Sequence, residues 1–313
     1  TTTTLSIPVG ILKVYSELAQ ARMQVSTMDP VDQSLGDLHL GPKVWGSSKA
    51  ALLMEYYEDG IALTEDIVHS PMNSQTQRIL STVARSLSRL HSLEFPLKTL
   101  PTTASSPTNH RSNMLWDSIE VLLQRIQEPF IRSLLQTQVD FQRDQLEKLG
   151  LPMVQVGHGD FKPSNVLWLP TCQEIRFIDL ETVGSYYRAY DLAKFFRTRT
   201  ATNATQVNQE YFFQCYREAA AAANPSKNNY GIVLPPSTVS LLLLEAELLL
   251  PMTWLEAAIF FHASRQPATG SGDEWKSMAS DRFHQYQRAN ATFLSTVEQY
   301  QRTRQEFLLS TCT

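Results

Sequence analysis

The sequence predicts an α+β protein with two lobes, a small antiparallel β lobe followed by a larger, mainly helical lobe. Segments with β-branched and aromatic residues, typical of strands, fall at 7–15, 40–46 and 50–60. From residue 74 onward, long segments instead carry apolar residues at helical spacing. We therefore divide the chain into an N-terminal lobe over residues 1–60 and a C-terminal lobe over residues 61–313.

The composition indicates an ordinary globular protein rather than a binder of nucleic acid. The 313 residues are 42% hydrophobic and 19% charged, with a formal net charge of -4. A protein that binds the phosphate backbone of a nucleic acid needs clustered Lys and Arg, so we expect no nucleic-acid partner. The three cysteines, Cys172, Cys215 and Cys312, show neither a disulfide framework nor the spacing of a zinc site.

The chain opens with Thr-Thr-Thr-Thr-Leu and lacks the basic and apolar segments of a signal peptide. Together with the cysteine pattern, this predicts a cytoplasmic protein in a reducing compartment. The chain also lacks an initiating Met, and we expect the N-terminal lobe to be incomplete.

The apolar run over residues 240–261 is the one segment that we consider as a membrane-spanning helix. Glu245, Glu247, Glu256 and Pro251 interrupt it. A charge near the centre of a spanning helix costs a few kcal/mol. We therefore predict a buried helix of the core and no membrane span.

The other expected helices follow from periodicity and from capping residues. They cover residues 74–93, 113–127, 130–149, 190–198, 208–223 and 273–308, the last as one long polar helix. A loop rich in Pro, Thr and Ser is expected from Phe95 to Ser112. His91, near the end of the first of these helices, reads as a histidine at the edge of the core.

Residues 154–181 are the most informative stretch, because they read as strand segments carrying polar side chains. His158, Asp160 and Asn165 lie in one loop, and an apolar hairpin returns Asp179 beside them. Two carboxylates and an amide offer the hard oxygen ligands that Mg²⁺ prefers, with one carboxylate left to orient a nucleophile. A turn between strands is the plainer interpretation of His-Gly-Asp alone.

This stretch resembles a known family. His158-Gly-Asp-Phe-Lys-Pro-Ser-Asn165 and Phe177-Ile-Asp-Leu-Glu181 resemble the catalytic segment of the aminoglycoside phosphotransferase-like kinases, a branch of the protein-kinase-like fold. The following residues, to Tyr190-Asp-Leu-Ala-Lys-Phe-Phe196, look like those of choline/ethanolamine kinases. The resemblance implies a bilobal kinase-like fold and an enzyme that uses ATP and Mg²⁺ to phosphorylate a small-molecule hydroxyl.

The resemblance also assigns roles in the catalytic segment. Asp160 would accept the proton of the substrate hydroxyl, and Lys162 would reach the γ-phosphate. Asn165 and Asp179 would hold the metal. His158 belongs to the same catalytic segment, where it reads as a brace for the loop more than as a base.

In the N-terminal lobe the resemblance implies a nucleotide site. Lys13 resembles the strand lysine that grips the α- and β-phosphates, although a solvent-facing lysine is the commoner reading of such a position. The backbone of Tyr56, Tyr57 and Glu58 would bind adenine, or would form an ordinary exit from an edge strand. The acidic partner of Lys13 departs from the family pattern, which leaves Asp32 or Glu17 as substitutes.

The residues expected to bind the acceptor depart from the family pattern. Ile259 and His262 stand where the family has two tryptophans of an aromatic cage for a quaternary ammonium group. Glu181, Tyr187 and Trp254 are the substrate-binding candidates, while burial in the core is the simpler interpretation of Trp254.

Three hypotheses therefore stay open. The first is a kinase for choline, ethanolamine or a related amino alcohol. The second is a sibling kinase acting on an aminoglycoside or another metabolite, and the third is a pseudokinase or scaffold with weakened catalysis. A homodimer is one assembly that the resemblance allows.

Overall fold

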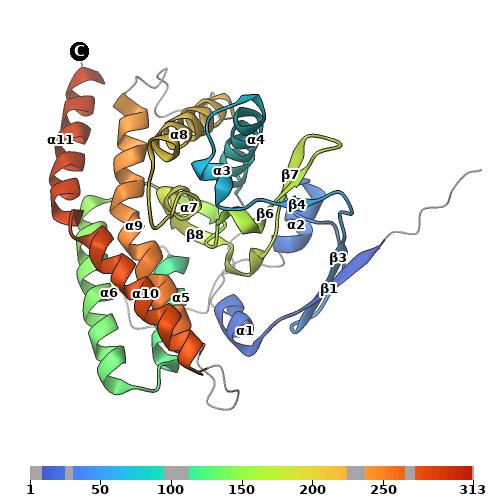
Figure 1. Cartoon of the computed structure of the whole chain (residues 1–313), viewed down its shortest axis with the longest axis horizontal. Coiled ribbons are helices and arrows are strands. Elements are labelled where there is room, and N and C mark those ends of the chain that lie inside the picture. The colour runs from blue at the N-terminus through green and yellow to red at the C-terminus, as the bar shows by residue number, and fades with distance from the viewer. Residues whose placement is uncertain (1–8, 25–30, 95–112, 224–236, 265–271, 312–313) are drawn as a thin grey trace, which may run out of the picture.

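The computed structural model describes residues 9–24, 31–94, 113–223, 237–264 and 272–311. Figure 1 shows a β lobe on the right and a larger helical lobe on the left. The β lobe holds an antiparallel sheet in the order β1 (Gly10–Val14), β3 (Ala51–Glu55) and β2 (Val44–Ser47). A small antiparallel β lobe beside a helical lobe is the fold class that the sequence predicts.

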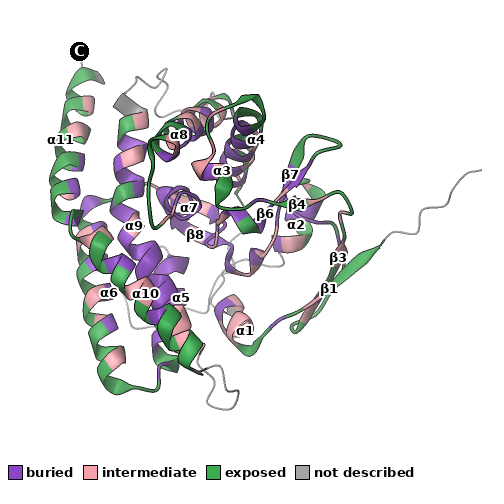
Figure 2. Cartoon of the chain, in the orientation of Figure 1, coloured by how far each residue is buried: buried purple, intermediate pink, exposed green. Residues whose placement is uncertain are grey.

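The β lobe has a small core of its own, made by Tyr15, Val44 and Leu52. Lys13 lies opposite Leu52 in the pairing of β1 with β3. Two short helices, α1 (Glu17–Gln24) and α2 (Val31–Asp37), follow β1. The apolar side chains of Leu12 and Val14 are 65% and 70% exposed, and β1 is green in Figure 2. The incomplete N-terminal lobe stays a prediction.

The chain then crosses to the helical lobe through β4 (Ile61–Ala62), which joins a second sheet with the antiparallel hairpin of β6 (Val166–Leu169) and β7 (Glu174–Phe177). This hairpin is the one that the sequence predicts. Between Asp179 and β8 lies a single 3-10 turn, Leu180–Thr182.

The aromatic stretch before Tyr190 forms a strand that the sequence analysis did not predict. This strand is β8 (Gly184–Tyr187), which pairs with β5 (Met153–Gly157) so that Tyr187 lies opposite Met153. Tyr186 and Tyr187 are buried, and buried backbone groups need partners, which β5 supplies.

The predicted helices other than 273–308 are confirmed, with boundaries shifted by a few residues. Asn73 caps the first long one by accepting hydrogen bonds from Gln75 N and Thr76 N, and Gly150 ends another at a φ of 58°. The loop expected at 95–112 lies outside the described residues. The helices between β4 and the C-terminus are α3 (Asp66–His69), α4 (Ser74–His91), α5 (Met114–Arg125), α6 (Pro129–Leu149), α7 (Arg188–Phe195), α8 (Asn203–Ala223), α9 (Ser237–Ala263), α10 (Gly272–Asn290) and α11 (Phe293–Thr311).

The apolar run expected to be a buried helix is α9, which packs against α5, α6, α7, α8, α10 and α11. Figure 2 shows it largely buried near the crossing with α10. Among the described residues, no helix combines the length and the apolarity needed to cross a membrane.

One expected helix, residues 273–308, is wrong as a single element. It is divided into α10 and α11 by a turn at Ala291 and Thr292. The turn lets α11 run back along α9, as Figure 1 shows in red beside orange. Phe293 and Tyr300 are thereby buried, and this burial favours the turn over a straight polar helix.

Candidate active site

The loop at residues 158–165 connects β5 to β6 and is fixed from below by α7. Asp191 accepts hydrogen bonds from the backbone N–H groups of His158 at 2.7 Å and Gly159 at 2.9 Å. His91 Nε2 donates to Asp191 Oδ2 at 3.0 Å. Burial would raise the pKa of Asp191, but the hydrogen bond from His91 and those of the loop lower it. The loop is therefore anchored by a buried carboxylate.

His158 is fully buried and both of its ring nitrogens face backbone groups. Its Nε2 donates to the Ile178 carbonyl at 3.0 Å, and its Nδ1 accepts from Asp160 N at 3.3 Å. The imidazole thus ties the loop to the residue before Asp179. This is the geometry of a loop brace, and it leaves neither nitrogen directed at a substrate.

Asp160 is held by three donors of the catalytic segment and its surroundings. Lys194 Nζ lies 3.0 Å from Oδ1 and Lys162 Nζ lies 3.1 Å from Oδ2, while Asn165 Nδ2 donates to Oδ2 at 2.9 Å. Burial opposes the charge of Asp160, but Lys194, Lys162 and the more distant Arg22 hold its pKa well below the usual range. Asp160 is therefore a carboxylate at neutral pH, able to accept a hydrogen bond from a hydroxyl.

A buried ionic network behind Asp160 was missed by sequence reasoning. Lys194 Nζ also contacts Glu256 Oε2 at 3.1 Å, and Arg22 Nη2 lies 2.9 Å from Glu256 Oε1. Arg22 Nε donates to Ser118 Oγ at 2.8 Å. Burial would raise the pKa of Glu256, but Lys194 and Arg22 lower it. The network joins α1, α5, α7 and α9 to the carboxylate of Asp160.

The signal for this network was present in the sequence. Lys194 precedes two phenylalanines in an apolar helix, and Glu256 interrupts the apolar run of α9. A charged residue inside an apolar helical run indicates a buried partner of opposite charge. Sequence alone does not tell which partner it is, because the two residues lie 62 positions apart.

On the other side of the loop, Lys13 of β1 meets two carboxylates of the helical lobe. Its Nζ lies 2.6 Å from Asp179 Oδ1 and 2.5 Å from Glu181 Oε2. Burial opposes its charge, but Glu181 and Asp179 raise the pKa of Lys13 to about 12. Asp179 has a φ of 60°, a left-handed conformation that directs the chain into the following 3-10 turn.

The acid partner of Lys13 therefore differs from the expected ones. Neither Glu17 nor Asp32 forms an ion pair with Lys13 among the described residues. Burial raises the pKa of Asp32, and the charge of Lys13 opposes that shift. Asp179 and Glu181 take the partner role because the strand places Lys13 directly over the turn after β7.

The donor chemistry of this region suits a divalent cation. Asp179 and Glu181 present carboxylate oxygens to one ammonium group, and Asn165 uses its amide N–H toward Asp160, which leaves its carbonyl oxygen as an acceptor. Such hard oxygen ligands are those that Mg²⁺ takes. Among the described residues no group of three or more His, Cys, Asp and Glu side chains is arranged to hold a metal. The metal role of Asn165 and Asp179 stays a prediction.

The expected hinge lies between β3 and β4. Tyr56 N donates to the Val9 carbonyl at 3.0 Å, and Tyr57 is fixed by its hydroxyl, which donates to Glu55 at 2.9 Å. Glu58 is exposed. A cavity of about 420 Å³ is lined by Tyr57 together with Gly36, Asp37, His39, Lys43, Glu55 and Arg176. The adenine-binding role of the hinge is untested by these contacts.

The three substrate candidates contact different parts of the protein. Glu181 lies in the site beside Lys13. The Tyr187 ring is buried with its edge toward Trp116, at 6.3 Å between centroids. The ring of Trp254 is 4% exposed and is approached by two arginine side chains. The structure does not gather these rings into one aromatic cage.

Comparisons with known proteins identify the family of the chain. The family model described as "Phosphotransferase enzyme family" matches residues 10–222, which is more than half of the chain. The chain belongs to this phosphotransferase family. The match begins at β1, includes Lys13 and the whole catalytic loop, and ends in α8. No curated protein sequence matches the chain.

Solved structures of other phosphotransferases share the fold. An ethanolamine kinase from Plasmodium vivax has a TM-score of 0.66 and 15% identity, covering 92% of this chain and 77% of its own. A choline kinase from Cryptosporidium parvum has a TM-score of 0.60 and 16% identity, covering 91% and 83%. An ADP-bound aminoglycoside phosphotransferase, APH(2'')-Ib, has a TM-score of 0.51 and 14% identity, covering 91% and 88%.

Proposed function

We propose that this phosphotransferase is a small-molecule kinase that transfers the γ-phosphoryl group of ATP to a hydroxyl of an amino alcohol, with choline and ethanolamine as the first acceptors to test. The observation that carries the proposal is the ionised Asp160 held between Lys162 and Asn165, with Asp179 across the loop. Phosphoryl transfer needs positioning and charge stabilisation more than covalent chemistry, and these residue types supply both.

Each residue then has a defined task. Asp160 accepts the hydrogen bond of the acceptor hydroxyl and takes its proton as the new phosphate ester bond forms. Lys162 offers positive charge to the transferring group, and Lys13 offers it to the α- and β-phosphates. Bound Mg²⁺ would neutralise phosphate charge, held by the oxygen atoms of Asn165 and Asp179. The similarity to choline and ethanolamine kinase structures supports the amino alcohol.

A second candidate is a sibling activity on a neutral hydroxyl, such as that of a sugar or an aminoglycoside. The environment of Trp254 favours it, because arginine groups already lie against the one candidate ring that could serve as a tryptophan cage wall. A ring face covered by guanidinium groups is not available to a quaternary ammonium ion.

The deciding experiment measures ADP release with Mg·ATP and a panel of amino alcohols, sugars and aminoglycosides. We expect turnover with an amino alcohol and a loss of about 10²-fold or more in Asp160→Asn. Asp144→Asn is the matched control, because Asp144 is an exposed carboxylate paired with Lys148 on α6. Turnover that survives Asp160→Asn would reject the proposal.

The panel also separates the third hypothesis, a pseudokinase. A protein that binds Mg·ATP, seen as a concentration-dependent rise in melting temperature, but turns over no acceptor would be a scaffold. Turnover only with sugars or aminoglycosides would instead select the sibling activity.

A further inference from the structure

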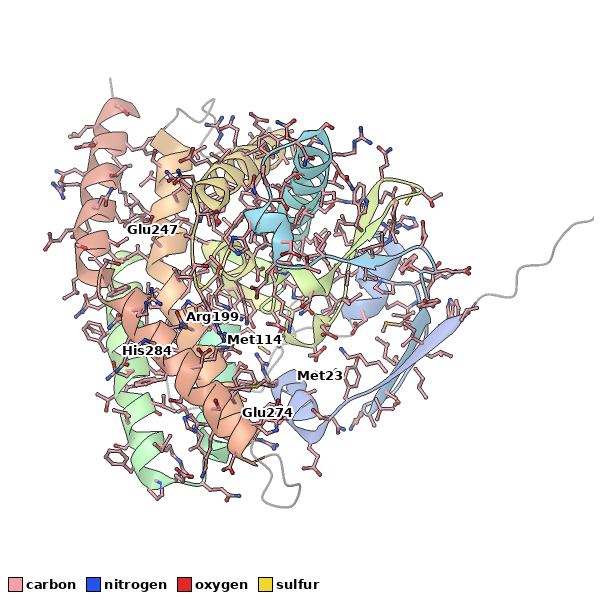
Figure 3. The ribbon with its side chains drawn as sticks, in the orientation of Figure 1. Met23, Met114, Arg199, Glu247, Glu274 and His284 are labelled. Atoms are coloured by element: carbon pink, nitrogen blue, oxygen red, sulfur yellow. The ribbon has the colours of Figure 1, made fainter. Side chains whose placement is uncertain are left out.

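Two arginines lie against one tryptophan at the junction of α7, α9 and α10, and a third, Arg199, is joined to them through Asp281. The guanidinium carbons of Arg197 and Arg282 lie 4.8 Å and 5.2 Å from the ring centroid of Trp254. Arg199 follows in the loop after α7 and reaches toward α10, and its side chain is 58% exposed. Figure 3 labels Arg199 at the level where α9 and α10 cross. Two guanidinium groups thus pack on one buried indole, and Arg199 lies beside them at the protein surface.

This cluster has less negative charge than positive charge. Asp281 forms ion pairs with Arg199 at 2.8 Å and with Arg282 at 3.4 Å, through the same oxygen Oδ2. Arg197 Nη1 donates to the carbonyl of Thr253, which is a neutral acceptor. Among the described residues, Asp281 is therefore the one carboxylate that forms ion pairs with this group of three arginines.

Another arginine on a tryptophan shows what full charge compensation looks like in this protein. Arg143 lies 5.6 Å from the ring centroid of Trp116. It pairs with Glu120 at 3.0 Å and with Glu147 at 2.9 Å, so two carboxylates serve one guanidinium group. An arginine can therefore stack on a tryptophan in this protein with its charge fully paired, so stacking does not explain the excess positive charge around Trp254.

Like charges held close together are destabilising unless an anion joins them. Burial lowers the pKa of the Arg282 guanidinium, and Arg197 and Arg199 lower it further, against the opposite effects of Asp281 and Glu65. The folded chain nevertheless holds these guanidinium groups close together. Guanidinium groups bind carboxylate and phosphate through paired hydrogen bonds, and Arg199 is exposed enough to do so.

We propose that Arg197, Arg199 and Arg282 form an anion-binding subsite that takes a phosphate or carboxylate group, with Trp254 as the platform that holds two of the guanidinium groups in place. The exposed guanidinium of Arg199 is the first contact of the ligand. Arg282, half-buried on the tryptophan, supplies the second positive charge.

The subsite lies next to the catalytic network. Arg197 N donates to the carbonyl of Lys194 at 3.4 Å, and Lys194 contacts Asp160. The Tyr190 hydroxyl experiences the charges of both Arg197 and Asp160. The anion bound by the subsite could therefore be an anionic group of the acceptor or a free phosphate ion. The first source rests on the proposed function, and the second does not.

The test is calorimetric titration of the nucleotide-free protein with inorganic phosphate, against chloride at constant ionic strength. We expect Arg199→Gln to weaken phosphate binding about ten- to a hundredfold, the value of a hydrogen bond to a charged group. Arg143→Gln is the matched control, an arginine of similar setting that should leave the affinity unchanged. Thermal unfolding without phosphate checks that each variant is folded.

Equal phosphate affinity in the wild type and Arg199→Gln overturns the subsite. A loss of all phosphate binding in Lys162→Gln overturns it as well, because the ion would then lie at the catalytic loop. A second arm compares ethanolamine with the amino alcohols serine and homoserine, which carry a carboxylate. A lower KM for the carboxylate-bearing acceptor, lost in Arg199→Gln, identifies the acceptor as the source. Phosphate binding that Arg199→Gln weakens, together with no turnover of any acceptor in the panel, supports the subsite while rejecting the kinase.

Discussion

At the scale of single residues, the site depends on how Asp160 is held as well as on its charge. Lys194 Nζ lies 3.0 Å from Asp160 Oδ1, and its charge, like that of Lys162, lowers the pKa of the carboxyl group. It also donates to the Gly159 carbonyl at 3.0 Å, so one ammonium group fixes both the loop and the side chain. Lys194 is therefore a positioning residue that acts through Asp160.

We expect Lys194→Met to lower kcat about 10- to 100-fold, because a misplaced base loses its alignment with the acceptor. The acid limb of the pH–rate profile should also move to higher pH, since the change removes a charge that lowers the pKa of Asp160. Lys194→Arg, which retains the charge, should recover part of the rate. A lower rate with an unmoved acid limb would assign Lys194 a purely structural role.

Glu256 allows a matched test of stability on one helix. It is 4% exposed and pairs with Lys194 and Arg22, so Glu256→Gln leaves buried cations without their counter-charge. We expect a loss of about 3 kcal/mol in the free energy of unfolding, measured in urea. Glu247→Gln, on the exposed face of α9 and labelled in Figure 3, should change it by less than about 0.5 kcal/mol. Similar losses in both variants would contradict the network.

At the scale of elements, sequence periodicity was sufficient wherever a helix has one apolar face. α4, α5 and α6 lie where the pattern places them, because each buries one face against the lobe. The break between α10 and α11 was missed because a polar helix has no local signal for the turn. β8 was missed because its pairing partner, β5, is distant in the chain.

Two glycines with positive φ differ in the space around them, so their substitution distinguishes backbone strain from steric clash. A Cβ at Gly150, the cap of α6 with φ of 58°, would meet nothing within 4 Å. A Cβ at Gly159, with φ of 79°, would lie 2.3 Å from the Tyr186 hydroxyl and 2.6 Å from the Thr182 carbonyl. The catalytic loop therefore has no room for a side chain at this position.

We expect Gly150→Ala to cost about 1 kcal/mol in the free energy of unfolding, the strain of a left-handed residue. It should leave turnover unchanged. Gly159→Ala should cost more than this and abolish turnover, because the loop must move away from β8 and carry Asp160 with it. Urea unfolding and ADP release measure the two effects. An active Gly159→Ala protein would show that the loop tolerates displacement.

At the scale of the whole molecule, the ion pairs of Lys13 with Asp179 and Glu181 are among the contacts that join the two lobes, beside the pair of Arg22 with Glu256. The catalytic motif predicted that Asp160, Asn165 and Asp179 belong together, because a short loop and a hairpin fix their separation. The partners of Lys13 could not be predicted in this way. They depend on how the β lobe sits over the helical lobe, and a contact between residues 166 positions apart leaves no local trace in the sequence.

The buried carboxylates also set the pH dependence of the whole fold. The pKa values of Asp160, Asp191 and Glu256 are all lower in the folded protein than the ordinary values of about 4 in the unfolded chain. Groups with a lowered folded pKa contribute stability above the unfolded pKa, and this contribution is lost as the pH falls toward the folded pKa.

We therefore expect the free energy of unfolding contributed by these carboxylates to stay constant from about pH 6 to pH 8 and to fall below about pH 5. Urea unfolding at pH 7, 5 and 4 measures this decline. Glu256→Gln removes one of the three linked carboxylates, so its stability should fall less steeply between pH 5 and pH 4 than that of the wild type. Parallel declines in the two proteins would show that Glu256 keeps an ordinary pKa, and the buried network would then not be the source of the acid sensitivity.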